Sequence, residues 1–262
     1  MNILEEIVAY KKTEVARQKT LMRADQLEKF GFFSEPSLSL KASLKNRTGI
    51  ITEFKRRSPS KGIINDTADV FETTRAYTDA RASGLSVLTD SKFFGGSTDD
   101  LIKARINRIP ILRKDFIIDE YQVIEAKAIG ADVILLIAAC LSPQEVKAFA
   151  ATTKQLGMEV LLEIHDEEEL GHICDEVDLV GVNNRNLKTF TVDLEQSIRL
   201  AEKIGNTKLR IAESGISSPA NLKYLQQHGF DGFLIGERFM KEANPGMEFR
   251  KFVDELNTII DY

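Results

Sequence analysis

The sequence predicts an α/β fold of the (β/α)8 barrel type, the TIM barrel, preceded by a helical extension. Eight short apolar runs follow one another from Gly49 onward, and each leads through polar or glycine-rich residues into the next pattern, usually a helical one. Strands that alternate with helices pair in parallel through right-handed crossovers. The chain has 262 residues, a usual size for one such barrel, and no linker divides it. Residues 1–262 are therefore expected to form a single domain.

Residues 1–44 are expected to form the helical extension within that domain. Ile3, Leu4, Ile7, Val8 and Val15 approximate a helical stripe, with polar residues on the other positions. A stripe of this kind indicates an amphipathic helix that covers apolar surface of the barrel. A role in gating a site is the alternative.

The barrel elements follow in order after the extension. Strands are expected at Ile50–Lys55, Leu85–Thr89, Ile111–Lys114, Val133–Ile137, Glu159–Glu163, Leu179–Val182, Leu209–Ala212 and Gly232–Ile235. Helices are expected at Ala68–Ala82, Tyr121–Ile129, Pro143–Leu156, Asp193–Ile204, Pro219–His228 and Glu248–Leu256. Ser142-Pro143 and Ser218-Pro219 mark two helix starts clearly, because a capping hydroxyl precedes a proline suited to the first turn.

A doubly wound open sheet is the competing architecture for the same alternation. That fold normally carries a glycine-rich fingerprint directly after its first strand. Here the corresponding stretch reads Glu53-Phe-Lys-Arg-Arg-Ser-Pro-Ser, which has no glycine. The closed barrel is therefore preferred.

Composition excludes several classes of function. The chain has 35 basic and 40 acidic residues, a net charge of -5, which argues against a nucleic-acid or anionic-membrane partner. Two cysteines and three histidines show no metal-ligand spacing, so no metal site is expected. No apolar run is long enough to cross a bilayer, and the acidic amino terminus does not resemble a secretory signal. We expect a cytoplasmic protein, monomeric, with a homodimer as the alternative.

Ionisable residues stand at the carboxyl ends of four predicted strands, the first, third, fifth and seventh. In a barrel, strand residues of one parity point inward, and those near the carboxyl ends build the active site. The inward parity contains Glu53, Lys55, Lys114, Glu163 and Glu213, and it also contains Asn183, Phe116 and His165. Charges withdrawn from water need partners, so we expect these groups to meet around one cavity. Solvated strand ends are the alternative.

Such a set supports proton transfer. A lysine that is crowded by other cations and partly desolvated has a lowered pKa, and it can give up a proton near neutral pH. A glutamate held away from water can act as the complementary base. A lysine could also form a Schiff base with a carbonyl substrate, and the sequence does not separate these two uses.

The loops after the last two strands indicate an anionic ligand. Ser214-Gly215 follows the seventh strand and Gly236-Glu237 follows the eighth, where glycines let backbone N–H groups approach a phosphate. The first loop, Lys55–Gly62, adds four cations and the hydroxyls of Ser58 and Ser60. It is either a solvated loop or a flap that closes over carboxylate or phosphate groups.

Motifs in this order along the chain resemble the indole-3-glycerol phosphate synthase family. The matching stretches are Glu53-Phe-Lys-Arg-Arg-Ser-Pro-Ser-Lys-Gly, Ser86-Val-Leu-Thr-Asp, Phe93-Phe-Gly-Gly-Ser, Leu112-Arg-Lys-Asp-Phe, Leu161-Leu-Glu-Ile-His, Gly181-Val-Asn-Asn-Arg-Asn-Leu, Ala212-Glu-Ser-Gly-Ile and Phe233-Leu-Ile-Gly-Glu. The resemblance implies a step of tryptophan biosynthesis without cofactors. In that step 1-(2-carboxyphenylamino)-1-deoxyribulose 5-phosphate closes to indole-3-glycerol phosphate with loss of carbon dioxide and water.

The resemblance also implies roles for the residues at the strand ends. Lys114 matches the family's principal general acid, which protonates the substrate ketone as the aromatic ring attacks it. Lys55 is implied to hold the substrate carboxylate and is a second candidate for the proton donor in dehydration. Glu53 and Glu163 are implied as base or as partners that orient the lysines. Asn183 matches a further polar residue of the catalytic set.

The remaining implied residues bind substrate. Glu213 matches a polar residue of the site, and Phe93 and Phe116 are candidates for the wall beside the aromatic ring. Read from the residues alone, an apolar wall is available from Phe93, Phe94, Phe116 and Leu234. The implied phosphate contacts are Ser58, Ser214, Gly215, Gly236 and Glu237, the last through its backbone N–H because its carboxylate would repel phosphate.

Two rival functions remain open on the sequence. A sugar-phosphate isomerase such as phosphoribosylanthranilate isomerase would be expected to carry a cysteine at the end of the first strand, where this chain has Glu53 and Lys55. A non-catalytic barrel that senses or stores a phosphorylated metabolite is the second rival. A measurement of turnover distinguishes this non-catalytic barrel from an enzyme.

Overall fold

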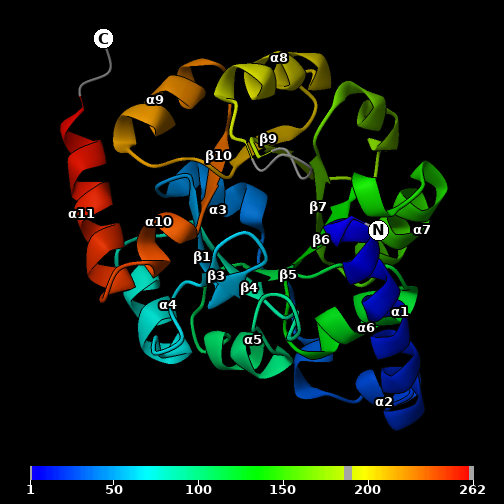
Figure 1. The fold of residues 1–262 in the computed structure, drawn as a ribbon. Helices are drawn as coiled ribbons and strands as arrows, with labels where there is room; N and C mark the ends of the chain where they lie inside the picture. The colour runs from blue at the N-terminus through cyan, green and yellow to red at the C-terminus, as the bar shows by residue number, and fades with distance from the viewer. Residues whose placement is uncertain (1, 186–190, 260–262) are drawn as a thin grey trace.

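Eight parallel strands close into a barrel in the computed structural model, which describes residues 2–185 and 191–259 (Figure 1). The strands run around the barrel in the order β1, β10, β9, β8, β7, β6, β5, β4. Their bounds are β1 (Ile50–Phe54), β4 (Gly84–Leu88), β5 (Ile111–Lys114), β6 (Val133–Ile137), β7 (Glu159–Ile164), β8 (Leu179–Asn183), β9 (Leu209–Glu213) and β10 (Gly232–Ile235). The predicted (β/α)8 barrel is confirmed, and each predicted strand lies within one residue of its observed bounds at either end.

Helices cover the outside of the barrel. They are α4 (Val70–Asp79), α5 (Thr98–Ala104), α6 (Glu120–Ala128), α7 (Pro143–Gln155), α8 (Leu194–Ile204), α9 (Pro219–Gln227), α10 (Glu237–Met240) and α11 (Pro245–Thr258), with the 3-10 turns η2 (Ala138–Cys140) and η3 (Glu167–His172). Ser142 and Ser218 cap α7 and α9 as expected. The sequence analysis missed α5 and α10, which are too short to show a helical period.

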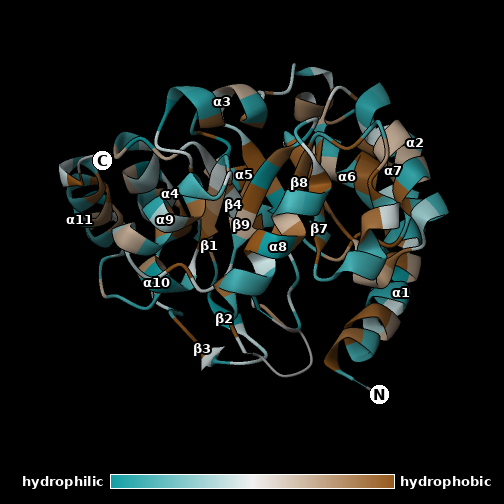
Figure 2. Ribbon diagram, turned by 90° about the horizontal axis from the view of Figure 1, so that it is seen from above, coloured by the Kyte–Doolittle hydropathy of each residue, from teal (hydrophilic) through white to brown (hydrophobic). Residues whose placement is uncertain are grey.

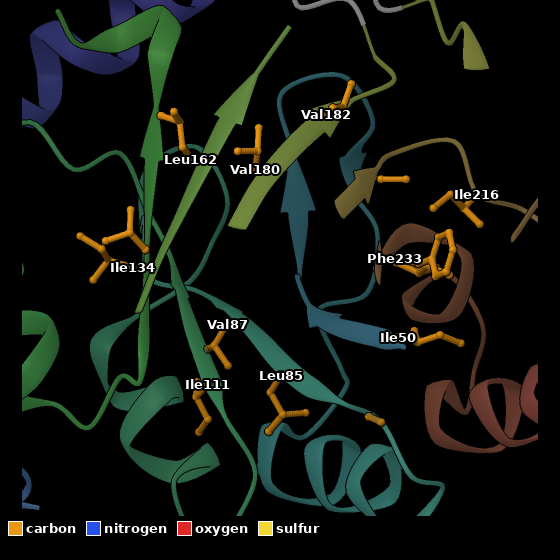
Figure 3. Packing of buried hydrophobic residues seen from close by; sticks show 14 of the residues in the cluster. Ile50, Leu85, Val87, Ile111, Ile134, Leu162, Val180, Val182, Ile216 and Phe233 are labelled. Carbon is orange, nitrogen blue, oxygen red and sulfur yellow. The ribbon is translucent and has the colours of Figure 1, made fainter. Parts of the chain in front are cut away.

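Two apolar layers follow from the alternation of strand side chains. Residues of one parity, such as Ile134, Leu162 and Val180, pack outward against the helices (Figure 3). Residues of the other parity, including Leu112, Leu135 and Leu161, fill the barrel interior. The inward parity assigned from the sequence is the one that the structure shows.

The extension comprises α1 (Ile3–Leu21), α2 (Ala24–Leu27), η1 (Gly31–Ser34) and α3 (Leu40–Asn46), and α3 closes the amino-terminal end of the barrel. Leu40 and Leu44 of α3 belong to the interior cluster, and Glu159 accepts hydrogen bonds from Ser39 Oγ (2.6 Å) and Leu40 N (2.9 Å). In Figure 2, α3 lies at one end of the barrel and the hairpin of β2 (Arg57–Ser58) and β3 (Gly62–Ile63) at the other.

A buried lysine anchors α1 beside the carboxyl ends of β4 and β5. The Lys11 side chain has no exposed surface, and its Nζ lies 3.0 Å from each of Glu14 Oε1, Asp90 Oδ2 and Asp115 Oδ1. Arg113 lies 3.2 Å from Asp115 Oδ2 on the other side. Burial opposes the charge on Lys11, but the three carboxylates outweigh it and raise the pKa of Lys11 above its ordinary value. The extension is thus ionically tied to the residue that follows Lys114.

None of the helices in residues 2–185 and 191–259 combines the length and the hydropathy of a membrane span.

Candidate active site

A cavity of about 320 Å³ opens at the carboxyl ends of the strands. It is the place where a (β/α)8 barrel carries its active site. Of the fourteen residues singled out from the sequence, thirteen line it: Glu53, Lys55, Ser58, Lys114, Phe116, Glu163, Asn183, Glu213, Ser214, Gly215, Leu234, Gly236 and Glu237. The five charged residues at the ends of four strands therefore meet around one space, as the parity argument required.

Phe93 is the exception, and Phe94 takes its place at the cavity wall. The Asp90 carboxylate accepts hydrogen bonds from the backbone N–H groups of Phe93 (2.7 Å) and Phe94 (3.2 Å), which shapes a turn after β4. In this turn the Phe93 ring packs edge-on against Tyr10 of α1, with centroids 5.9 Å apart. The Phe94 ring lies 5.9 Å from that of Phe116, and both rings line the cavity.

Lys114 lies at the centre of the charged residues. Its Nζ donates to Glu163 Oε2 at 2.8 Å and to Glu213 Oε2 at 2.7 Å. Asn183 Nδ2 donates to the other oxygen of Glu163, Oε1, at 3.0 Å. Side chains from β5, β7, β8 and β9 are thereby joined in one network that orients the ammonium group.

Burial and the charges in this network determine the pKa values of Lys114 and Glu213. Burial opposes the charge on Lys114, but Glu163 and Glu213 outweigh it and raise the pKa of Lys114 above its ordinary value. The expectation of a lowered lysine pKa is therefore wrong for Lys114, because carboxylates and not cations surround it. Burial raises the pKa of Glu213 to about 7, with the charge of Glu163 adding to it and Lys114 acting against it. For Glu163, in contrast, burial is outweighed by Lys114 and His165, which lower its pKa. Near neutral pH Glu163 is therefore ionised, whereas Glu213 takes up a proton readily.

Two glycines leave room for the buried carboxylates. A Cβ atom at Gly181 on β8 would clash with Glu213 Oε1, and one at Gly236 would lie 2.6 Å from Glu53 Oε1. Both positions are inward-facing, where any larger residue would displace the acid next to it. The close approach explains why glycine stands at these two places in an otherwise filled interior.

Glu53 and Lys55 form a second ion pair in the cavity. Lys55 Nζ lies 2.7 Å from Glu53 Oε1, and Ser86 Oγ donates to Glu53 Oε2 at 3.4 Å. The Glu53 side chain is only 4% exposed, whereas that of Lys55 is 17% exposed. Lys55 therefore reaches toward the open part of the cavity, and Glu53 remains within it.

Cations on several loops line the cavity around this pair. Arg185, Arg238 and Lys241 are among its lining residues, together with Ser214 and Gly215, whose φ angles are 68° and 71°. The loop carrying Ser214 is held by Asn184 Nδ2, which donates to its carbonyl oxygen at 2.7 Å. An anionic ligand would meet several positive side chains here.

The carboxylate of Glu237 is paired with two cations at the cavity. It lies 3.2 Å from Arg185 Nη2 and 3.4 Å from Lys61 Nζ. Burial raises its pKa, but these two cations outweigh burial and hold the pKa of Glu237 below its ordinary value. The side chain thus neutralises neighbouring cations.

The first loop uses its cations in different ways. Arg56 donates to Asp100 Oδ1 at 2.9 Å and Arg57 to the carbonyl oxygen of Ser91 at 2.7 Å, so both are structural. The loop is folded as the β2–β3 hairpin, and Ser60 Oγ accepts from Arg185 Nη1 at 3.1 Å. The hairpin therefore covers the cavity with serine hydroxyls rather than with its arginines.

Several functional residues escaped the sequence analysis. Arg185 follows Asn183 and Asn184 outside any regular strand, so side-chain alternation does not reach it. The motif that contains these residues ends with Asn186 and Leu187, which lie outside the described residues. Ile3, Leu4 and Ile7 of α1 also line the cavity, which the apolar stripe noted in the sequence could have suggested.

The acids of the cavity are paired with side chains of the protein. Within the part of the chain that the structure describes, no group of three or more His, Cys, Asp or Glu side chains is arranged to hold a metal ion. The acids of the cavity are engaged instead with lysine, asparagine and histidine.

Comparisons with known proteins agree on one family. Residues 4–252 match the family model described as indole-3-glycerol phosphate synthase. Curated proteins of that name from Bacteroides thetaiotaomicron (49% identity, 97% of this chain and 99% of that protein), Acinetobacter baumannii (41%, 98% and 97%) and Neisseria meningitidis (43%, 95% and 98%) are similar along nearly the whole length.

A solved structure gives a more distant likeness. The 3-hexulose-6-phosphate synthase from Salmonella typhimurium matches with a TM-score of 0.58 and 13% identity, over 79% of this chain and 98% of that one. That likeness shows the barrel fold alone. The family match and the relatives reach further, because they cover the strand ends and loops that build the cavity: the chain belongs to the indole-3-glycerol phosphate synthase family.

Proposed function

We propose that the cavity converts 1-(2-carboxyphenylamino)-1-deoxyribulose 5-phosphate to indole-3-glycerol phosphate, carbon dioxide and water, as a carboxy-lyase of tryptophan biosynthesis. The observation that carries the proposal is the position of Lys114, held between Glu163 and Glu213 inside a cavity lined by cations. Membership of the family supports the same reaction.

Lys114 is the general acid of ring closure in this proposal. The aromatic carbon that bears the carboxylate attacks the ketone, and negative charge develops on the ketone oxygen. An ammonium group fixed by two carboxylates relieves that charge and donates a proton. The high pKa of Lys114 is compatible with this role, because an alkoxide is more basic than an amine.

Loss of carbon dioxide and then of the hydroxyl group completes the indole ring. Dehydration needs an acid for the departing oxygen and a base for a proton on the substrate. Lys55 or Lys114 supplies the acid, and Glu53, Glu163 or both supply the base or orient the lysines. Asn183 fixes Glu163 through the hydrogen bond at 3.0 Å.

Substrate binding is divided between two kinds of surface. Phe94, Phe116 and Leu234 form the apolar wall beside the aromatic ring, and of the four candidates from the sequence only Phe93 is left out of it. Lys55 receives the substrate carboxylate. We assign phosphate contacts to Ser58, Ser214, Gly215, Gly236 and the backbone of Glu237, and we add Arg185 because it lines the same cavity.

The decisive experiment mixes the purified protein with the carboxyphenylamino ribulose phosphate in the presence of EDTA and follows indole fluorescence. We expect indole-3-glycerol phosphate, confirmed by mass spectrometry, at an undiminished rate with the chelator. Phosphoribosylanthranilate, the substrate of the rival isomerase, serves as the control and is expected to remain unchanged. A protein that binds the substrate without forming product would support the sensor function instead.

Arg185→Gln is expected to raise KM for this substrate at least about tenfold, with kcat much less changed. A charge-assisted hydrogen bond to an anion contributes about 1.5–3 kcal/mol, and the Arg185 guanidinium is a lining group of the cavity. Steady-state kinetics on the variant measure this.

The matched control for that variant is Arg199→Gln, which removes an exposed arginine from α8. It is expected to leave both constants unchanged. An unaltered KM in Arg185→Gln would remove Arg185 from anion binding and leave it only its contacts with Ser60 and Glu237.

A further inference from the structure

His165 lies at the edge of the catalytic network, in direct reach of one of its acids. It follows β7, and its side chain is 11% exposed. His165 Nε2 is 3.1 Å from Glu163 Oε1, and Nδ1 is 3.3 Å from Glu169 Oε2. The imidazole thus lies between two carboxylates, one in the catalytic network and one outside it.

The segment after β7 is built to bring Glu169 back to this histidine. The other strand-to-strand crossovers carry an α-helix, whereas β7 and β8 are joined through the six-residue 3-10 turn η3. Asp166 Oδ1 caps η3 by accepting from the backbone N–H groups of Glu168 (3.0 Å) and Glu169 (3.3 Å). Glu169 Oε2 in turn accepts from the backbone N–H of His165 at 2.6 Å. Backbone and ring of His165 are therefore held by the same carboxylate.

Both oxygens of Glu163 are occupied as a result. Oε2 accepts from Lys114 at 2.8 Å, while Oε1 accepts from Asn183 at 3.0 Å and faces His165 Nε2 at 3.1 Å. The Glu163 side chain is 6% exposed, so these three groups make up its environment rather than water. Its orientation depends on all of them.

The surroundings of His165 favour the charged ring. The ionised groups that face the ring are Glu163 on β7 and Glu169 on η3. The neighbouring η2 turn contributes the Cys140 thiol. Burial and the same two carboxylates raise the pKa of Cys140 to about 12, so this thiol is neutral. Burial favours the neutral imidazole, but the two carboxylates outweigh it and raise the pKa of His165 to about 10.

We propose that His165 is a positioning residue: as an imidazolium held between Glu163 and Glu169, it keeps Glu163 ionised and its second oxygen directed at Lys114. The proposal deepens the function proposed above and rests on it where it concerns turnover. In this arrangement Glu163 positions the general acid, Lys114.

Nuclear magnetic resonance tests the charge on His165 without any turnover. The chain contains three histidines, and the rings of His172 and His228 contact only main-chain carbonyl oxygens or a tyrosine ring. In the ¹⁵N spectrum of the wild-type protein at pH 8 we expect a doubly protonated imidazole that belongs to His165. That signal is expected to vanish in His165→Gln and to persist in His172→Gln.

Kinetics test the positioning role with the same pair of variants. Glutamine keeps an N–H donor but not the positive charge. We expect His165→Gln to lower kcat about tenfold with KM within twofold, because a small displacement of the acid costs rate rather than binding. His172→Gln lies on the same η3 turn without contacting Glu163, and its kcat is expected to stay at the wild-type value.

The outcomes are separable. A neutral His165 ring at pH 8 in the wild-type protein would overturn the proposal even if His165→Gln failed to fold. Equal kcat values in the two variants would overturn the positioning role. If the protein formed no indole product while the imidazolium signal was present, the proposed reaction would be wrong. The ion pair between His165 and Glu163 would still be supported.

Discussion

Lys114→Ala is expected to lower kcat at least ~10²-fold, the usual contribution of a positioned general acid. The variant loses both the proton donor and the positive charge that joins Glu163 to Glu213. Substrate binding depends chiefly on other groups, namely the apolar wall and the cations around it, so KM should change far less. Steady-state kinetics by indole fluorescence measure both constants, and circular dichroism checks the fold.

Lys114→Arg separates the charge from the proton. An arginine keeps a cation between Glu163 and Glu213, but its guanidinium does not give up a proton in proteins. If Lys114 acts as the acid, the arginine variant is expected to be nearly as slow as the alanine variant. Turnover close to the wild-type value in Lys114→Arg would show that the charge alone matters, and near-wild-type turnover in Lys114→Ala would remove Lys114 from the mechanism.

Side-chain alternation explains why the catalytic residues could be predicted from the sequence. Once the strands are located, a period of two determines which residues point inward. Glu53, Lys114, Glu163 and Glu213 each lie on or at the end of a strand, and errors of one residue in the bounds do not change their parity. The cavity residues that depend on strands alone were therefore predictable.

Residues on loops follow no such rule. Phe93 and Phe94 are neighbours of the same type, and only the hydrogen bonds that Asp90 accepts from both N–H groups decide which ring lines the cavity. Arg185 lies beyond the end of β8 and reaches Ser60 of a different loop. Side-chain direction at such positions comes from turn geometry and long-range contacts, which a single sequence does not reveal.

The protonation states of the site residues are even harder to predict from the sequence than the direction of loop side chains. The pKa of Lys114 is raised because two carboxylates lie within 2.8 Å of its Nζ. A different arrangement of the same strand ends, with Lys55 nearer to Lys114, would have lowered it. The distances between side chains decide whether the pKa of Lys114 is raised or lowered. Strand parity shows only that these side chains point into the same cavity.

Lys11→Met is expected to lower the free energy of unfolding by about 3–5 kcal/mol, the cost of removing one partner from a buried ion pair. Methionine keeps an apolar stem of similar length, so the change is chiefly one of charge. Asp90 and Asp115, both nearly inaccessible to solvent, would lose the ammonium that lies 3.0 Å from each. Urea unfolding followed by circular dichroism measures the difference.

Lys12→Met is the matched control, because Lys12 is the exposed neighbour of Lys11 on the same helix. Its free energy of unfolding should lie within about 0.5 kcal/mol of the wild-type value. If Lys11→Met were as stable as this control, Asp90 and Asp115 would have to be satisfied by Arg113, Thr89 and backbone N–H groups alone. The extension would then be held by apolar packing, and the ion pair between Lys11 and Asp115 would not stabilise the fold.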